Sequence, residues 1–101
     1  MYLVIIHYDR PMDEVAAVRP EHRDYLQAHY RRGLMVCSGP QVAGHGGVLL
    51  ARGGDRAAVE ALCAEDPYRR RGVAHHEIIE FEAKSCAPGF EPFAAPFAGA
   101  A

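Results

Sequence analysis

The stretch Arg19-Pro20-Glu21-His22-Arg23-Asp24-Tyr25-Leu26 predicts the first turns of a helix that presents a histidine. Proline suits the first turn of a helix, because its missing N–H group would have no partner there in any case. The residues three, four, seven and eight positions after His22 are Tyr25, Leu26, His29 and Tyr30. This spacing forms one stripe on a helix, and Gly33 is placed to end that helix in a left-handed conformation. We therefore expect His22 to face the core side of the helix.

A second stretch, Asp66-Pro67-Tyr68, predicts the end of another helix. Asp55 is a natural N-cap for a helix over residues 56–65. Asp66 continues the apolar stripe of that helix, four residues after Leu62. The residue before a proline avoids the α region, so the helix should stop at Asp66. The sequence therefore predicts a carboxylate held at a helix end, on or near the core-facing side.

Four segments have the β-branched and aromatic content of strands. The helix that begins near Pro20 and the helix over residues 56–65 lie between these strands, so the order is strand–helix–strand–strand–helix–strand. The segment over residues 13–18 is also compatible with a helix but is short. This order suits a ferredoxin-like α+β domain, in which two helices cover one face of a four-stranded antiparallel sheet. The strands are apolar on both faces, so we expect the sheet of a second molecule to cover the other face and form a homodimer. The predicted strands are Tyr2–Tyr8, Leu34–Ser38, Val48–Arg52 and Val73–Ala83.

The chain divides into one domain over residues 1–83 and a C-terminal tail over residues 84–101, which is rich in Ala, Pro, Gly and Phe. The tail shows no pattern of a regular element from residue 85 onward. Its three phenylalanines are spaced for an extended chain that lays its rings on an apolar groove. They are Phe90, Phe93 and Phe97.

Composition excludes several classes of protein. The formal net charge is −2 and the pI about 6.3, so no clustered basic face for nucleic acid is expected. The 3 cysteines are odd in number and include no Cys-x-x-Cys pair, which argues against a disulfide framework or a zinc finger. The apolar N-terminal run is too short for a signal core or a membrane span. We expect a cytoplasmic protein with no membrane partner.

His22 and Asp66 are the best candidates for chemistry. A histidine takes and gives protons near neutral pH, and an adjacent carboxylate fixes its tautomer and stabilises its charged form. The alternative is a histidine–carboxylate contact that serves only stability. His7 could point into the same cleft, although a core histidine is the simpler interpretation. Chelating His pairs are absent from any one element, so neither a metal nor a cofactor is expected; a site built from His7, His22 and Asp66 is the metal alternative.

A sharp corner, Ser38-Gly39-Pro40, separates the two stretches. Gly39 lets the backbone approach a ligand and Ser38 offers a hydroxyl, although a plain turn explains the same residues. These pieces, in this order, resemble the YCII family from Met1 to about Phe81. The resemblance implies a dimeric α/β barrel, related in fold to muconolactone isomerase and to stress-responsive barrel proteins.

The same resemblance implies an active-site pair of His22 and Asp66. We assign substrate binding to Ser38, Gly39, Pro40 and Tyr68, which lie in the matching motifs, and to His7 from its place on the first predicted strand. One branch of the wider family resembles dehydrochlorinases that act on chlorinated hydroxyquinols, which favours elimination or isomerisation of a small ring compound. The alternative function is a non-catalytic dimeric module that binds a small ligand or a partner protein.

Overall fold

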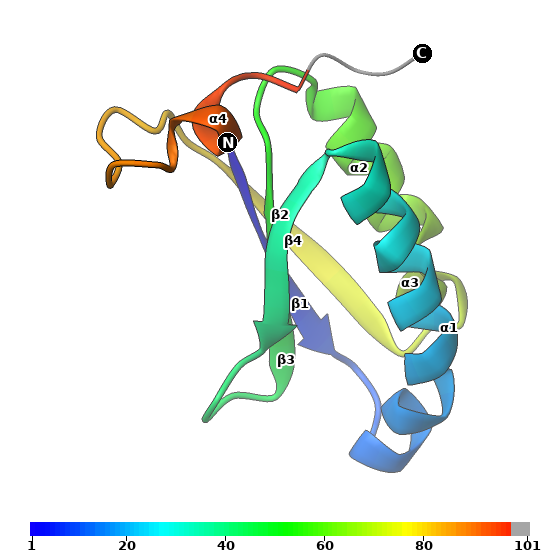
Figure 1. The fold of residues 1–101 in the computed structure, drawn as a ribbon. Helices are drawn as coiled ribbons and strands as arrows, with labels where there is room; N and C mark the ends of the chain where they lie inside the picture. Colours follow the sequence, from blue (N-terminus) through cyan, green and yellow to red (C-terminus); the bar gives the residue numbers. More distant parts are fainter. Residues whose placement is uncertain (98–101) are drawn as a thin grey trace.

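A computed structural model (Figure 1) shows a four-stranded antiparallel sheet with α1, α2 and α3 packed on one face. The structure describes residues 1–97. The strand order is β2-β3-β1-β4, so β1 lies inside the sheet between β3 and β4. The predicted ferredoxin-like α+β sheet is confirmed, whereas the dimeric barrel stays a prediction for a single chain. The elements are β1 (Tyr2–Tyr8), α1 (Met12–Arg32), β2 (Met35–Pro40), β3 (Gly46–Ala51), α2 (Arg56–Glu65), α3 (Pro67–Arg70), β4 (Ala74–Glu80) and α4 (Glu91–Ala94).

The sequence of β1 is apolar without alternation because side chains on both of its faces are at least half-buried. Its even-numbered residues face the helices, and Val4 and Ile6 are buried there at 0% and 2% exposure. The odd-numbered residues lie on the opposite face, where they are half-buried in the single chain. There Leu3 lies across from Leu50 and Ile79, and Ile5 lies across from Val48. This second apolar face has no helix over it in the described chain.

Helix α1 corrects the prediction of a helix that starts near Pro20. It runs without a break from Met12 to Arg32, with Pro20 in its interior. An interior proline loses one backbone hydrogen bond and costs about 3 kcal/mol. Burial of one face outweighs that cost, because Val15, His22 and Leu26 continue the same buried stripe through the proline. Gly33 ends the helix at φ 83°, as predicted.

Asp66 occupies a junction between two helices rather than a simple helix end. Asp55 caps α2 by accepting a hydrogen bond from the Ala58 N–H at 3.0 Å, as predicted. Pro67 stops α2 but begins the short helix α3, a position where proline is favoured. The Asp66 carboxylate caps α3 by accepting a 2.9 Å hydrogen bond from the Tyr68 N–H. The local sequence therefore fixes the backbone around this carboxylate on both sides.

The tail differs from its prediction in two respects. Strand β4 ends at Glu80 instead of residue 83, and one turn of helix, α4, forms where no regular element is expected. Phe97 is buried, and its N–H donates a 2.7 Å hydrogen bond to the Gly53 carbonyl. Phe93 instead remains 47% exposed. Phe97 therefore holds the tail on the domain, and residues 98–101 of the predicted tail lie outside the described residues.

None of the helices in residues 1–97 combines the length and apolar content that a bilayer span requires.

Candidate functional site

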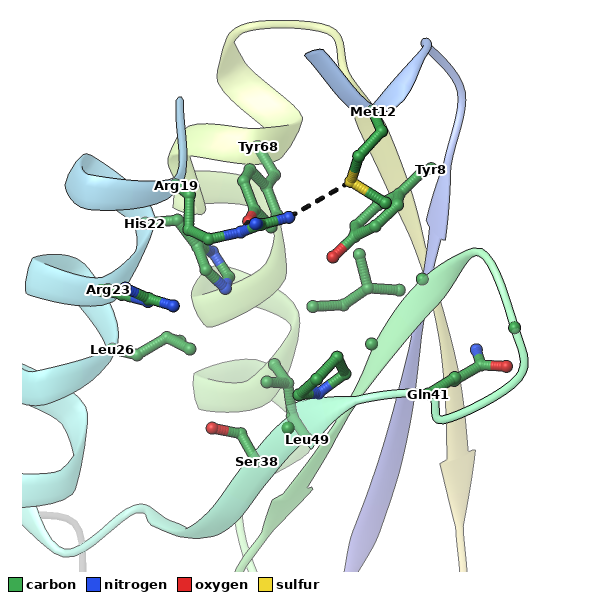
Figure 2. A pocket seen from close by; sticks show the side chains of 16 residues that line it. Tyr8, Met12, Arg19, His22, Arg23, Leu26, Ser38, Gln41, Leu49 and Tyr68 are labelled. Atoms are coloured by element: carbon green, nitrogen blue, oxygen red, sulfur yellow. Dashed lines mark hydrogen bonds between the residues drawn. The ribbon is translucent and has the colours of Figure 1, made fainter. Parts of the chain in front are cut away.

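A cavity of about 460 Å³ lies between α1, the Tyr68 ring and the strands β1, β2 and β3 (Figure 2). Its walls are mixed in character: apolar side chains and glycines line the sheet side, and two arginines and a histidine extend from α1. The polar and charged lining residues are Tyr8, Arg19, His22, Arg23, Ser38, Gln41 and Tyr68, and the others are Ile6, Met12, Leu26, Gly39, Pro40, Gly44, Gly46, Gly47 and Leu49.

His22 and Asp66 are in direct contact, 44 residues apart in the sequence. His22 Nδ1 lies 2.7 Å from Asp66 Oδ1, and both residues are buried, at 7% and 1% exposure. An ionised carboxylate only accepts, so Nδ1 is the donor, and in the neutral ring Nε2 then carries no hydrogen. Nε2 makes no hydrogen bond within residues 1–97, and the ring lines the cavity. The arrangement therefore turns a proton-accepting nitrogen toward whatever occupies the cavity.

A second histidine, His76, binds the other oxygen of the same carboxylate. Its Nε2 lies 2.9 Å from Asp66 Oδ2, and its side chain is only 1% exposed. Its Nδ1 is buried without a partner in the described chain. The tautomer with hydrogen on Nε2 is favoured, because it leaves an unpaired lone pair instead of an unpaired N–H. Asp66 thus bridges two imidazoles.

His76 was missing from the sequence prediction, although a signal for it exists. Adjacent strand residues point to opposite faces, so either His75 or His76 must face the helices. Two residues away on each side, Ala74 and Ile78 are apolar and share the face of His76. That alternation selects His76 as the inward residue. His75 instead lies on the outer face and contacts Asp9 at 2.8 Å.

Opposing effects set the pKa of Asp66. Burial raises the pKa, since it penalises the charged form. Hydrogen bonds from His22 and His76, the charge of His22 and the Tyr68 N–H outweigh burial and lower the pKa to about 2. The carboxylate is therefore ionised at neutral pH, as a group that orients and balances an imidazolium must be.

Tyr68 forms the floor beneath His22. The two rings stack with centroids 3.8 Å apart and planes 8° from parallel. The Tyr68 hydroxyl accepts a 3.3 Å hydrogen bond from Arg19 Nε, and burial is the main cause that raises the pKa of Tyr68. Arg19 precedes His22 by three residues, a spacing that places both side chains on one face of α1. That spacing is the sequence signal by which Arg19 could have been found.

The segment Ser38-Gly39-Pro40 is not the predicted sharp corner. Its residues continue β2 to Pro40, beyond the predicted end at Ser38, because all three pair with β3. The segment lines the cavity opposite α1, and the Ser38 hydroxyl is hydrogen-bonded to the Tyr30 hydroxyl. The structure therefore brings together His22, this strand end and Tyr68 around one space.

His7 is the predicted site residue that the structure places elsewhere. It belongs to the odd-numbered face of β1, away from the helices, because side chains alternate along a strand. There its Nε2 lies 3.0 Å from Glu77 Oε1, and its ring stacks on His75 at 4.8 Å. The expectation that His7 shares the cleft with His22 is wrong, and so is the metal alternative built on both. Within residues 1–97, no three His, Cys, Asp or Glu side chains are placed to hold a metal ion.

Known proteins resemble this chain at two levels. A family model described as the YCII-related domain matches residues 1–82. A solved structure of 5-chloro-2-hydroxyhydroquinone dehydrochlorinase from Burkholderia phenoliruptrix AC1100, in complex with 2,5-dihydroxybenzoquinone, has a similar fold with a TM-score of 0.66. The similarity covers 80% of this chain and 93% of the dehydrochlorinase at 17% sequence identity, so it concerns the fold alone. No curated protein shows significant sequence similarity.

Proposed function

This chain belongs to the YCII-related domain family, and on that premise we propose that it is a small-molecule enzyme with His22 as general base and acid. Asp66 is the partner that holds and balances His22. The observation that supports this most directly is the 2.7 Å contact between His22 Nδ1 and Asp66 Oδ1 at the wall of a cavity. A stability contact alone would not require the other ring nitrogen to face that space.

The proposed reaction class is elimination or isomerisation on a small ring compound. Both reactions begin when a base removes a proton from a ring hydroxyl, so that its C–O bond becomes C=O and a ring carbon becomes nucleophilic. In isomerisation the proton is returned to a ring carbon; in elimination HCl is lost overall, because chloride leaves with the C–Cl electron pair and a second ring double bond forms. In the proposed reaction, His22 Nε2 accepts the proton and Asp66 stabilises the imidazolium that forms. His76 is a positioning residue, since it contacts Asp66 and not the cavity.

The choice of a ring compound is supported by the apolar part of the lining and by the neighbouring fold. The apolar residues Ile6, Leu26 and Leu49 offer side chains against which a ring can pack. The dehydrochlorinase of similar fold is described with a bound quinone. We propose that Ser38, Gly39, Pro40 and Tyr68 form the wall that holds the substrate against His22.

We further propose that the active form is a homodimer with sheets packed face to face. The outer face of the sheet is apolar at its centre, where Leu3, Ile5 and Leu50 are half-buried and Ile79 is 40% exposed. A chain of 101 residues buries little area by itself, and exposed apolar patches of this kind are typical of interfaces.

The test uses 5-chloro-2-hydroxyhydroquinone as the first substrate and measures chloride release and quinone absorbance. We expect turnover by the wild type and a loss of about 10²–10⁴-fold in His22→Gln, the usual contribution of a general base. Asp66→Asn should lose activity as well. His29→Gln is the matched control, because His29 lies on the same helix as His22 but does not line the cavity.

The outcomes separate the two functions considered. If the wild type is no faster than His22→Gln on a panel of such ring compounds, the enzymatic proposal fails. Binding of these compounds without any turnover would then favour the non-catalytic ligand-binding module.

A further inference from the structure

The charges that line the cavity are all of one sign. Arg19 and Arg23 extend into it from α1 (Figure 2), and His22 lies between them in the sequence. Asp and Glu are absent from the lining residues in the described chain. Asp66 lies behind His22, and both of its oxygens already accept hydrogen bonds from protein donors. The cavity therefore presents cations to its contents without an anion of its own.

The two arginines differ in their partners from the three arginines that form ion pairs outside the cavity. Arg10, Arg56 and Arg71 each form an ion pair with a glutamate at 2.8–3.1 Å. Arg19 instead donates to the neutral Tyr68 hydroxyl at 3.3 Å and to the Met12 sulfur at 3.4 Å. Neither contact balances its charge. A half-buried guanidinium without a carboxylate partner is costly, and a bound anion would lower that cost.

Arg23 adds a second unpaired cation one helical turn beyond Arg19. The spacing of four residues puts both guanidinium groups on the cavity side of α1. Arg23 forms no hydrogen bond or ion pair within residues 1–97. A guanidinium binds planar oxygen pairs through two parallel N–H donors, which suits a carboxylate or an ionised hydroxyquinone.

We infer that the cavity takes a small unsaturated ring that carries an anionic oxygen group, and that Arg19, assisted by Arg23, binds that group. The ring then packs against the apolar wall formed by Ile6, Leu26 and Leu49. This placement leaves the remainder of the ring near His22 Nε2. The inference rests on the proposed function for the identity of the site as a substrate site, and it names the charge and shape of the substrate.

The test compares benzoate with benzamide, two planar probes of nearly equal size that differ in charge. Binding is followed by NMR, through the ring signals of His22 and the amide signals of Gly46 and Gly47, which line the cavity. We expect benzoate to bind at least about 10-fold more tightly, the usual value of a charge-assisted hydrogen bond. Added salt should weaken benzoate binding and leave benzamide unchanged.

Variants assign the preference to a residue. Arg19→Gln should remove most of the benzoate preference, and Arg19→Lys should keep part of it, because lysine retains the charge but not the planar fork. Arg31→Gln is the control: it removes an exposed arginine of the same helix that does not line the cavity. Melting temperatures of all three variants verify that the fold is retained.

Equal affinities for the two probes, no binding of benzoate, or an equal loss in Arg31→Gln would overturn the inference. These failures are distinct from failure of the proposed function. A protein that turns over ring substrates through His22 without preferring anions contradicts the inference alone. One that prefers benzoate but turns over no ring compound contradicts the catalytic proposal alone.

Discussion

Replacement of Asp66 by asparagine should destabilise the protein at neutral pH and remove part of its acid sensitivity. The carboxylate accepts hydrogen bonds from His22 Nδ1, His76 Nε2 and the Tyr68 N–H at 2.7–2.9 Å. An asparagine side chain has one oxygen and one NH₂ group in place of the two oxygens. Its shape is retained, but its charge and one acceptor are lost.

The size of the effect follows from the pKa of Asp66. Burial raises this pKa, but the donors around the carboxylate lower it from 3.8 to about 2. At ~1.4 kcal/mol for each pKa unit, the ionised form contributes about 2–3 kcal/mol to the free energy of unfolding. Because the folded pKa is the lower one, this contribution is complete above the unfolded value. It is lost as the pH falls from about 4 through 2.

The asparagine also disturbs His76. When the asparagine oxygen stays near His22 and Tyr68, the asparagine NH₂ group faces His76 Nε2. That nitrogen must then accept a hydrogen bond instead of donating one. The hydrogen of His76 moves to Nδ1, which is buried without a partner in the described chain. An unpaired buried donor costs about 1–3 kcal/mol. The loss at neutral pH should therefore be at least about 2 kcal/mol.

The assay is urea unfolding at fixed protein concentration, because self-association would make stability depend on concentration. The free energy of unfolding is measured from neutral pH to about pH 2 for the wild type, Asp66→Asn and Asp24→Asn. Asp24 is an exposed carboxylate of α1 and serves as the control. The gap between wild type and Asp66→Asn should narrow below about pH 4. A constant gap over the whole range, or an equal effect of Asp24→Asn, would refute the reasoning.

Three further predictions concern other parts of the molecule. The His76→Leu variant removes one hydrogen-bond donor to Asp66. The pKa of Asp66 should therefore rise, and the midpoint of acid unfolding should move to higher pH. An unmoved midpoint would contradict the bridging role of Asp66. In sedimentation equilibrium the wild type should have about twice the 11.1 kDa monomer mass, and Ile5→Asp on the outer face of the sheet should return it to the monomer mass; a wild-type monomer would contradict the dimer. Deletion of residues 88–101 should lower the melting temperature, because Phe97 is buried against the domain, whereas Phe93→Ala should have little effect; an unchanged truncated protein would contradict the anchoring role of the tail.

The short-range features of this fold were predictable because neighbouring residues cause them. The left-handed residue Gly33 ends α1, and Asp55 caps α2 through an N–H only three residues away. Strand β1 has the predicted bounds, since its β-branched and aromatic content is a local property. Helical spacing likewise placed His22 on the core-facing stripe of α1, and the proline after Asp66 placed that carboxylate at a helix end.

Other features depend on which faces are buried, and the sequence alone does not decide this. Pro20 was expected to begin a helix, but burial of the stripe through Val15 and Leu26 carries α1 across it. His7 was assigned to the cleft, but the register of β1 in the sheet places it on the outer face. Side chains alternate between the two faces of a sheet, so a shift of one residue along the strand moves a side chain to the opposite face. Only the assembled sheet decides which face each residue occupies.

The site residues likewise divide into those that the sequence predicted and those that only the tertiary structure placed. The resemblance of its motifs to the YCII family paired His22 with Asp66 before the structure was considered. Only the tertiary structure brought His76 to the second oxygen of Asp66 and placed Arg19 and Arg23 at the cavity without acidic partners. The physical reason is that hydrogen bonds, ion pairs and desolvation act through space at a few ångströms, between residues as far apart in the chain as His22 and Asp66. Local patterns determine which elements form, and packing of those elements determines which charges and donors meet.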